Sequence, residues 1–336
     1  MNLLSCLRGS ACSCVCVTAS VEDRPPAGLC AQPREKTGQR PVPPGVKVGQ
    51  PVASAATPTV VLEHVSKRFG QKQAVADLSL RLQPGEVFAF LGPNGAGKTT
   101  TLKITTGLLR SDTGEVRVCG YSMRGDGRRA KQYIAYVPDQ PFLYDKLTGR
   151  EFIYFARDMY AVPRGPADRR LEQLSERLDM GGFLDQLTES YSHGMKQKVA
   201  LAAAMIHEPR LLIVDEPIIG LDPRTIRVVK EMFREIAGRG GTVFLCTHTL
   251  DIVETLADRI GIIHQGRLIA LGTLQELRAH AQRTSRGPAA GRPEAANLCV
   301  GAGVGGGPSD GRLEDIFLQL TEGAVAPPGT TAECQP

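Results

Sequence analysis

One eight-residue segment decides how this chain folds: Gly92-Pro93-Asn94-Gly95-Ala96-Gly97-Lys98-Thr99. It fits the pattern G-x-x-x-x-G-K-[S/T], with an apolar strand pattern at 86–91 before it and a helical pattern at 98–109 after it. In such a loop the backbone N–H groups point inward at a polyphosphate, and only glycine tolerates the required backbone angles and close approach. The start of the following helix adds a favourable dipole. The segment therefore predicts a site for a nucleoside triphosphate.

Three side chains at the end of this segment are candidates for contact with the triphosphate. Lys98 can reach the β- and γ-phosphates. The Thr99 hydroxyl can be a ligand of Mg²⁺, and Thr100 follows it at the start of the helix. We expect ATP and Mg²⁺ as the ligands.

Two other strand patterns end in polar residues. The apolar run 211–214 is followed by Asp215 and Glu216, where one carboxylate can hold Mg²⁺ through water and the other can orient an attacking water. Without the phosphate loop, two acids that cap the next helix would be the better explanation. With the loop, the magnesium interpretation is favoured. His248 ends the run 242–247; since a lone histidine is more often structural, it is a candidate only in this company.

Composition divides the chain into three zones. Residues 1–57 are rich in Pro, Gly and Ala without sustained periodicity, which predicts a disordered leader. Residues 58–281 alternate apolar runs with helical patterns, as an α/β domain does. Residues 282–336 form a Gly/Ala/Pro-rich tail that we expect to be flexible. Its segment 313–321 is predicted to be a short helix, because four apolar residues fall on one helical face: Leu313, Ile316, Phe317 and Leu320.

Within the folded zone, short strands are predicted at 59–62, 78–82, 86–91, 133–137, 211–215, 242–247 and 260–264. A turn around Gly70 separates the first two strands. Residues 148–187 have a helical pattern with a break at Pro163 and Gly165. We therefore expect a helical subdomain, at about 148–208, inserted between strands.

Composition also disfavours several functional classes. The formal net charge is +5 and no long run of Lys and Arg occurs, which argues against nucleic acid as a partner. Trp is absent and aromatic residues make up 5%, so platforms for stacked bases are scarce. No stretch approaches the roughly 20 apolar residues that cross a bilayer, so we expect any membrane span to come from another chain. Cys12, Cys14 and Cys16 lack the paired spacing of a zinc site.

The order of the motifs resembles the nucleotide-binding subunit of an ABC transporter. The phosphate loop is followed by Tyr191-Ser192-His193-Gly194-Met195-Lys196-Gln197, then by Asp215-Glu216, Gly220-Leu221-Asp222-Pro223 and His248. The Ser-His-Gly-Met segment is similar to the signature motif of that family, and 220–223 is similar to its D-loop. The resemblance covers about 58–281 and the segment 313–321. It implies an α/β fold of the P-loop ATPase type, with a mostly parallel core sheet, a small antiparallel β subdomain and an inserted helical subdomain.

The resemblance implies roles for individual residues. Phe69 would stack on adenine, although a turn aromatic packed on the small sheet explains it equally well. Glu216 would polarise the hydrolytic water, and His248 would contact the γ-phosphate. Thr99 and Asp215 would be the residues that hold Mg²⁺.

The resemblance also implies a dimer of ATP-binding subunits. In the family two such subunits close head-to-tail around two nucleotides. The signature residues Ser192 and Gly194, with His193 and Met195 beside them, would then face the γ-phosphate of ATP held by the second subunit. Asp222 would couple the two sites.

Two positions depart from the family pattern. Asp139 stands where a glutamine is usual and Gln140 follows it; an aspartate there can still be a ligand of Mg²⁺ or of a water. His193 replaces the second residue of the usual Ser-Gly-Gly, where its ring either crowds the phosphate or adds a donor. Because Ser192 and Gly194 remain, we expect a working site.

The leading interpretation is an ATP-hydrolysing transporter subunit, peripheral on the cytoplasmic face of the cell membrane, with a separate transmembrane permease. In the family, the region that contains 141–148 and the helical block receives short coupling helices of the permease. The Ser-His-Gly-Met variant and the Leu-Glu-Asp-Ile-Phe sequence at 313–317 look most like those of multidrug, polysaccharide or lipid-type exporters, so the resemblance favours export. One alternative is a soluble ABC ATPase that acts on ribosomes or DNA, although the chain has neither a second nucleotide-binding module nor a long coiled-coil insertion. The other is a nucleotide-gated interaction module without hydrolysis, which the intact catalytic residues argue against.

Overall fold

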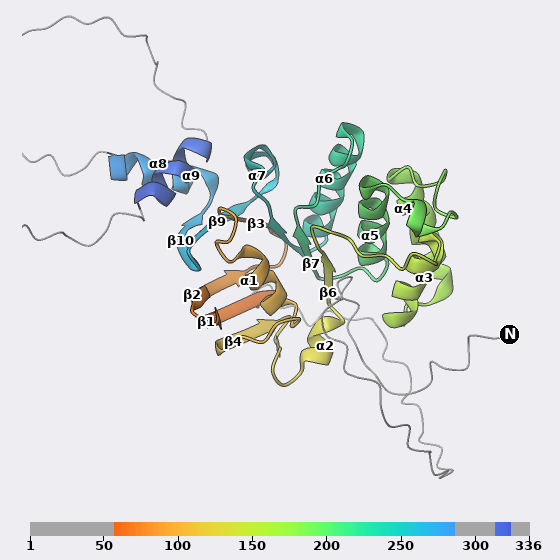
Figure 1. Cartoon of the computed structure of the whole chain (residues 1–336), viewed down its shortest axis with the longest axis horizontal. Coiled ribbons are helices and arrows are strands. Elements are labelled where there is room, and N and C mark those ends of the chain that lie inside the picture. Colours follow the sequence, from red (N-terminus) through yellow and green to blue (C-terminus); the bar gives the residue numbers. More distant parts are fainter. Residues whose placement is uncertain (1–56, 286–312, 324–336) are drawn as a thin grey trace, which may run out of the picture.

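The computed structural model describes residues 57–285 and 313–323. The leader predicted for 1–57 and the linker predicted between 282 and 312 fall almost entirely outside these residues, as do the cysteines of the leader. The described residues form two sheets with helices packed around them (Figure 1).

A six-stranded, mostly parallel sheet forms the centre of the molecule. Its strands are β3 (Val87–Leu91), β6 (Ile134–Val137), β7 (Leu211–Asp215), β8 (Thr242–Cys246), β9 (Arg259–His264) and β10 (Arg267–Gly272). They lie in the order β10-β9-β3-β8-β7-β6, and only β10 is antiparallel to its neighbour. Strands β3, β7 and β8 are buried along their whole length, which is why their sequences are continuous apolar runs. The predicted mostly parallel core sheet is confirmed.

A second sheet of four strands is antiparallel throughout. Its strands are β1 (Val60–Phe69), β2 (Lys72–Leu82), β4 (Thr113–Val118) and β5 (Tyr121–Ser122). The segments predicted at 59–62 and 78–82 are only the ends of β1 and β2, which continue to a turn at Gly70. Register shifts between Leu62 and Arg68 break the alternation of buried and exposed residues in β1, so its second half has no strand pattern.

Helices surround the central sheet. They are α1 (Lys98–Thr105), α2 (Gly127–Lys131), α3 (Gly149–Met159), α4 (Arg164–Arg177), α5 (His193–Met205), α6 (Pro223–Gly238), α7 (Leu250–Leu256), α8 (Leu274–Ser285) and α9 (Leu313–Gly323). In Figure 1, α3, α4 and α5 stand together at one side of the molecule, and β1, β2 and β4 lie beside α1 away from them. None of the helices in the described ranges is long and apolar enough to span a bilayer.

The helix after the phosphate loop is shorter than its sequence pattern predicts. It ends at Thr105 instead of residue 109, because Gly107 adopts the left-handed conformation with φ of 69°. There the Gly107 and Leu108 amides donate to the carbonyls of Ile104 and Lys103, which closes the helix.

The short helix predicted at 313–321 is present as α9 and packs on the domain. Leu313 and Ile316 are buried in a cluster with Val253 and Leu277, and the Leu313 amide donates to Glu254 Oε1 at 2.9 Å. Figure 1 shows α9 lying against α8 at the end of the molecule that is remote from α3 and α4. This helix is therefore part of the hydrophobic core. The sequence predicts the helix but does not predict that it packs on the domain.

Candidate active site

The polar residues of the candidate site follow the carboxyl ends of neighbouring parallel strands. Gly92 follows β3, Asp215 and Glu216 lie at the end of β7, and His248 comes shortly after β8. Asp139 comes two residues after β6. Because these strands are adjacent and parallel, the segments that follow them meet at one edge of the sheet.

Two glycines of the phosphate loop, Gly92 and Gly97, are required by close contacts with the neighbouring strands. A β-carbon on Gly92 would lie 2.4 Å from the carbonyl oxygen of Ile263, and one on Gly97 would lie 2.2 Å from that of Ala74. Gly97 also has φ of 109°, where it precedes the first residue of α1. The loop is therefore held in its curved form by β9 on one side and β2 on the other.

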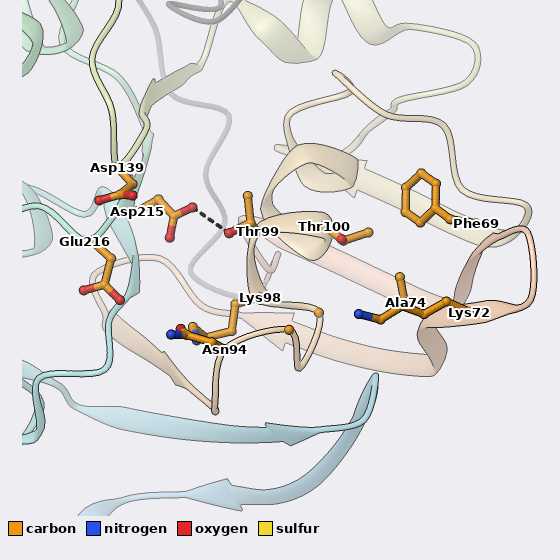
Figure 2. A pocket seen from close by; sticks show the side chains of 12 residues that line it. Phe69, Lys72, Ala74, Asn94, Lys98, Thr99, Thr100, Asp139, Asp215 and Glu216 are labelled. Carbon is orange, nitrogen blue, oxygen red and sulfur yellow. Dashed lines mark hydrogen bonds between the residues drawn. The ribbon is translucent and has the colours of Figure 1, made fainter. Parts of the chain in front are cut away.

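Lys98 and Thr99 are already engaged within the site. Lys98 is 7% exposed, and its ammonium donates to the carbonyls of Gly92 at 2.6 Å and Pro93 at 3.3 Å. The Thr99 hydroxyl donates to Asp215 Oδ2 at 2.9 Å, as the dashed line in Figure 2 shows. Thr99 and Asp215, which are both predicted to hold Mg²⁺, therefore lie side by side.

Asp215 lies at the buried end of β7. Burial raises the pKa of its carboxyl group to about 6, the charges of Glu216 and Asp139 act in the same direction, and the Thr99 hydrogen bond opposes them. No three or more His, Cys, Asp or Glu residues gather into a metal-binding cluster anywhere in 57–285 or 313–323. A magnesium ion held by Thr99 and Asp215 would complete its coordination with oxygen atoms of the bound nucleotide or of water.

Glu216 is held by the segment that follows β8. Its Oε2 accepts from the Thr247 hydroxyl at 3.0 Å, and its Oε1 accepts from the His248 amide at 3.0 Å. His248 Nδ1 lies 2.7 Å from the same Oε1, and the histidine side chain is 62% exposed. Glu216 also has a φ of 49°, a conformation that non-glycine residues adopt mainly where the surroundings impose it.

Helix capping does not explain the two acids after β7. The N-cap of the next helix, α6, is Asp222, which accepts from the Thr225 amide at 2.9 Å and from its hydroxyl at 2.6 Å. These hydrogen bonds hold the pKa of Asp222 down at about 2. Asp215 and Glu216 are therefore available to the site.

A pocket of about 290 Å³ brings these groups together. It is lined by Phe69, Lys72, Ala74, Asn94, Gly95, Gly97, Lys98, Thr99, Thr100, Asp139, Asp215 and Glu216. Figure 2 shows the carboxylates at one end of this pocket and Phe69 with Lys72 at the other, with the loop residues between them.

Asp139 and Gln140, which are both predicted to contact the nucleotide, differ in their position relative to the pocket. Asp139 lines the pocket and is half-buried, whereas Gln140 is exposed and is not among the lining residues. Phe69 also lines the pocket and is 49% exposed, so the small sheet leaves much of its ring free. The locations of Asp139 and Phe69 therefore both agree with contact to a nucleotide.

Sequence reasoning misses two lining residues, Lys72 and Ala74. They come from β2, where alternate residues share one face, and the prediction stops short of that part of the strand. A basic residue three positions after Phe69, across the turn at Gly70, is the signal that points to Lys72.

The signature residues lie elsewhere. None of Ser192, His193, Gly194 and Met195 lines the pocket of its own chain. As predicted, the segment opens a helix: Ser192 is the N-cap of α5, and its hydroxyl oxygen accepts from the Met195 amide at 3.3 Å. Ser192 and His193 are exposed.

Comparison with known proteins decides the family. The family model described as ABC transporter matches residues 75–219. The linearmycin resistance ATP-binding protein LnrL of Bacillus subtilis (strain 168) is 39% identical over 215 residues, which are 64% of this chain and 69% of that protein. The chain belongs to the ABC transporter ATP-binding proteins. As an ABC ATP-binding subunit, it is an ATPase that powers a transporter, as its motifs predict.

Two further comparisons agree with this assignment. The daunorubicin resistance ATP-binding protein DrrA3 of Streptomyces coeruleorubidus is 36% identical to this ABC subunit over 224 residues, 67% of this chain and 71% of that protein. The solved structure of an ATP-binding subunit of an ABC transporter matches with a TM-score of 0.68 and 30% identity, and covers 78% of this chain and 99% of that chain. The predicted fold of ABC type is therefore confirmed.

Proposed function

We propose that this ABC subunit binds ATP with Mg²⁺ in the pocket at 92–99, and that hydrolysis requires a second ATP-binding subunit. The observation that carries the proposal is the division of the site. The pocket contains the groups that hold phosphates and orient water, while Ser192 and Gly194 lie outside it in the same chain. Because the signature segment lies outside the pocket of its own chain, we expect it to contact the nucleotide bound by a partner subunit.

The residues present fit a magnesium ion. Thr99 and Asp215 offer a hydroxyl and a carboxylate oxygen, and Asp139 lines the same pocket. Mg²⁺ prefers such oxygen ligands and is usually held by one or two carboxylates together with the substrate phosphates. When bound, the ion would neutralise charge that develops on the β- and γ-phosphates.

The remaining steps follow from the positions of the side chains. Phe69 stacks on adenine, and the loop amides with Lys98 bind the β- and γ-phosphates. To do so the Lys98 ammonium exchanges its contacts with the Gly92 and Pro93 carbonyls for phosphate oxygens. Glu216 orients a water that attacks the γ-phosphorus, and the bond to the β–γ bridging oxygen breaks to leave ADP.

His248 has a second role in this scheme. Its contact with Glu216 fixes both side chains, and its exposed ring is available to the γ-phosphate. Positioned donors of this kind stabilise charge in the transition state because they need no reorganisation.

We infer that the transported compound is exported and that the permease is a separate chain at the membrane. Two relatives are named for resistance to linearmycin and to daunorubicin, which supports export. An exposed apolar surface formed by Phe142, Tyr144 and Leu187 supports docking of a permease. The Thr188 hydroxyl donates to the Tyr144 carbonyl at 2.8 Å, so the two segments of this surface are adjacent. The subunit would then be peripheral on the cytoplasmic face of the membrane.

A steady-state ATPase assay and gel filtration test the proposal together. Glu216→Gln should lower turnover at least about 100-fold, because it removes the charge that orients water. With ATP and Mg²⁺ the same variant should elute as a dimer, and without nucleotide as a monomer. Wild-type turnover no higher than that of Glu216→Gln would sink the assigned role of Glu216. A Glu216→Gln protein that stays monomeric with ATP would contradict the shared site.

A further inference from the structure

The start of α5 and the segment after Glu216 touch each other backbone to backbone. A β-carbon on Gly194 would lie 2.5 Å from the carbonyl oxygen of Gly220, which is closer than atoms of this kind approach. The signature segment and the D-loop of one chain are therefore packed without room for a side chain between them.

The ring of His193 covers the same glycine. A β-carbon on Gly220 would lie 2.7 Å from Cδ2 of His193 and 3.6 Å from its Cγ. Gly220 has φ of 78°, a backbone conformation that favours glycine, and a β-carbon there would displace the histidine ring. The ring packs against the chain's own D-loop. The sequence predicts only that the ring crowds the phosphate or adds a hydrogen-bond donor to it, and neither alternative includes this contact.

Two further contacts tie the same two segments together. Gln197 is fully buried, and its Nε2 donates to the carbonyl of Pro217 at 3.3 Å. Lys198 Nζ lies 3.8 Å from Asp222 Oδ2. The first turns of α5 therefore contact the segment 217–222 near its start, in its middle and at its end.

We propose that His193 is a positioning residue that braces the signature segment against the D-loop of the same chain. The segment 217–222 begins directly after Glu216, so the brace fixes Ser192 and Gly194 relative to Glu216. This inference rests on the proposed dimer, in which Glu216 serves the nucleotide of its own chain and the signature serves that of the partner. The brace in each chain then connects two nucleotide sites. One is the chain's own site, which contains Glu216, and the other is the partner's site, which the signature segment completes.

The packing role and a phosphate-donor role predict opposite results for two substitutions. His193→Ala removes the ring, and His193→Phe keeps a ring but removes both nitrogens. A brace should tolerate phenylalanine and not alanine, whereas a donor to phosphate should be lost in both.

The experiment measures four properties of both variants. For His193→Ala we expect kcat to fall about 5- to 10-fold, a range typical of coupling between sites, with the ATP affinity of the monomer unchanged. In the Glu216→Gln background the ATP-bound dimer should dissociate faster by a similar factor. Hydrogen exchange of the backbone amides at 218–222 of the monomer should also become faster. His193→Phe should stay within about twofold of the parent in all four measurements.

Each outcome has a consequence. Equal losses in His193→Ala and His193→Phe would overturn the brace in favour of a donor role, and no change in His193→Ala would overturn it outright. If the Glu216→Gln parent forms no dimer, the proposed dimer fails, and hydrogen exchange in the monomer still decides whether the brace exists. His64→Ala is the matched control, because His64 has a 79% exposed side chain on the small sheet and should change none of these values.

Discussion

The phosphate-binding half of the site, formed by 92–99, Asp215 and Glu216, is built into the parallel sheet, whereas the signature half, 192–195, lies at the start of α5. The first half is held by close backbone contacts, by buried side chains and by hydrogen bonds from the segment after β8. The second half is partly exposed and is tied chiefly to the D-loop. Under the proposed dimer, this difference makes ATP binding and ATP hydrolysis separable properties of the chain: the first is preorganised, and the second would be completed by the partner subunit.

Removal of the Lys98 side chain should have the largest effect, because this side chain belongs to the preorganised, phosphate-binding half of the site. We expect Lys98→Ala to weaken ATP binding and to lower turnover by about 100- to 1,000-fold, since it deletes a buried cation aimed at the phosphates. Lys103→Ala, on the same helix, is the matched control and should keep wild-type turnover. Near-normal turnover in Lys98→Ala would mean that the phosphates bind elsewhere.

Removal of the Ser192 hydroxyl should affect the other half alone. Ser192→Ala should lower turnover about 10- to 100-fold, as expected for the loss of one hydrogen bond to a charged group, and leave the ATP affinity of the monomer unchanged. Equilibrium binding and ATPase rates on the same protein provide the measurement. Ser190→Ala removes a hydroxyl that donates to the Leu187 carbonyl and should show neither change. A loss of monomer affinity in Ser192→Ala would erase the distinction between the halves.

The two halves also differ in how far the sequence predicts them. Strand β7 is predicted to the residue, because a buried parallel strand is a continuous apolar run, and the glycine pattern of the loop follows from contacts such as Gly92 with Ile263. The contact of His193 with Gly220 depends on tertiary packing, so spacing along the chain does not indicate it.

The same limit applies to the rest of the fold. The helical face of α9 is visible in the sequence, but its docking depends on Glu254, which lies 59 residues before Leu313. Strand β10 is a half-exposed edge strand without a clear pattern. Lys72 is missed because bulges and a turn interrupt the strand pattern between the two predicted segments.

Acid should loosen the helical part of the molecule, which carries the signature. His207 follows α5, and its ring stacks on Tyr160 after α3 with a centroid distance of 3.6 Å. Burial lowers the pKa of His207 to about 4, below its value in the unfolded chain, so stability is lost as pH falls from about 6.5 towards 4. The expected loss between pH 7 and pH 5 is about 2 kcal/mol.

His207→Phe isolates this contribution, because it keeps an aromatic ring on Tyr160 and removes the titration. Urea unfolding at pH 7 and pH 5 should show a smaller acid loss in the variant than in the wild type. Equal acid losses in His207→Phe and the wild type would assign acid sensitivity to other groups.

The smallest effect is expected at Lys72, and it sharpens the description of the preorganised half. Lys72 lies at the same end of the pocket as Phe69 and points towards the phosphate loop, and its ammonium is 3.7 Å from the position of a β-carbon on Gly95. In the proposed binding mode, a solvent-accessible cation there would face the part of the nucleotide between adenine and the β-phosphate. Lys72→Met should therefore weaken AMP, ADP and ATP equally, by about 3- to 10-fold, and leave adenosine unchanged.

Titration of the four ligands into the monomer measures this directly, with Lys72→Arg as the charge-conserving variant and Lys103→Met as the matched control. An effect confined to ATP would indicate that Lys72 contacts the γ-phosphate, as Lys98 is proposed to do. An equal loss for adenosine would make it a packing residue for the base. A uniform loss over the three phosphorylated ligands, restored by arginine, would show that the preorganised half extends past the glycine loop into β2. The chain would then hold the α-phosphate before any partner supplies its signature.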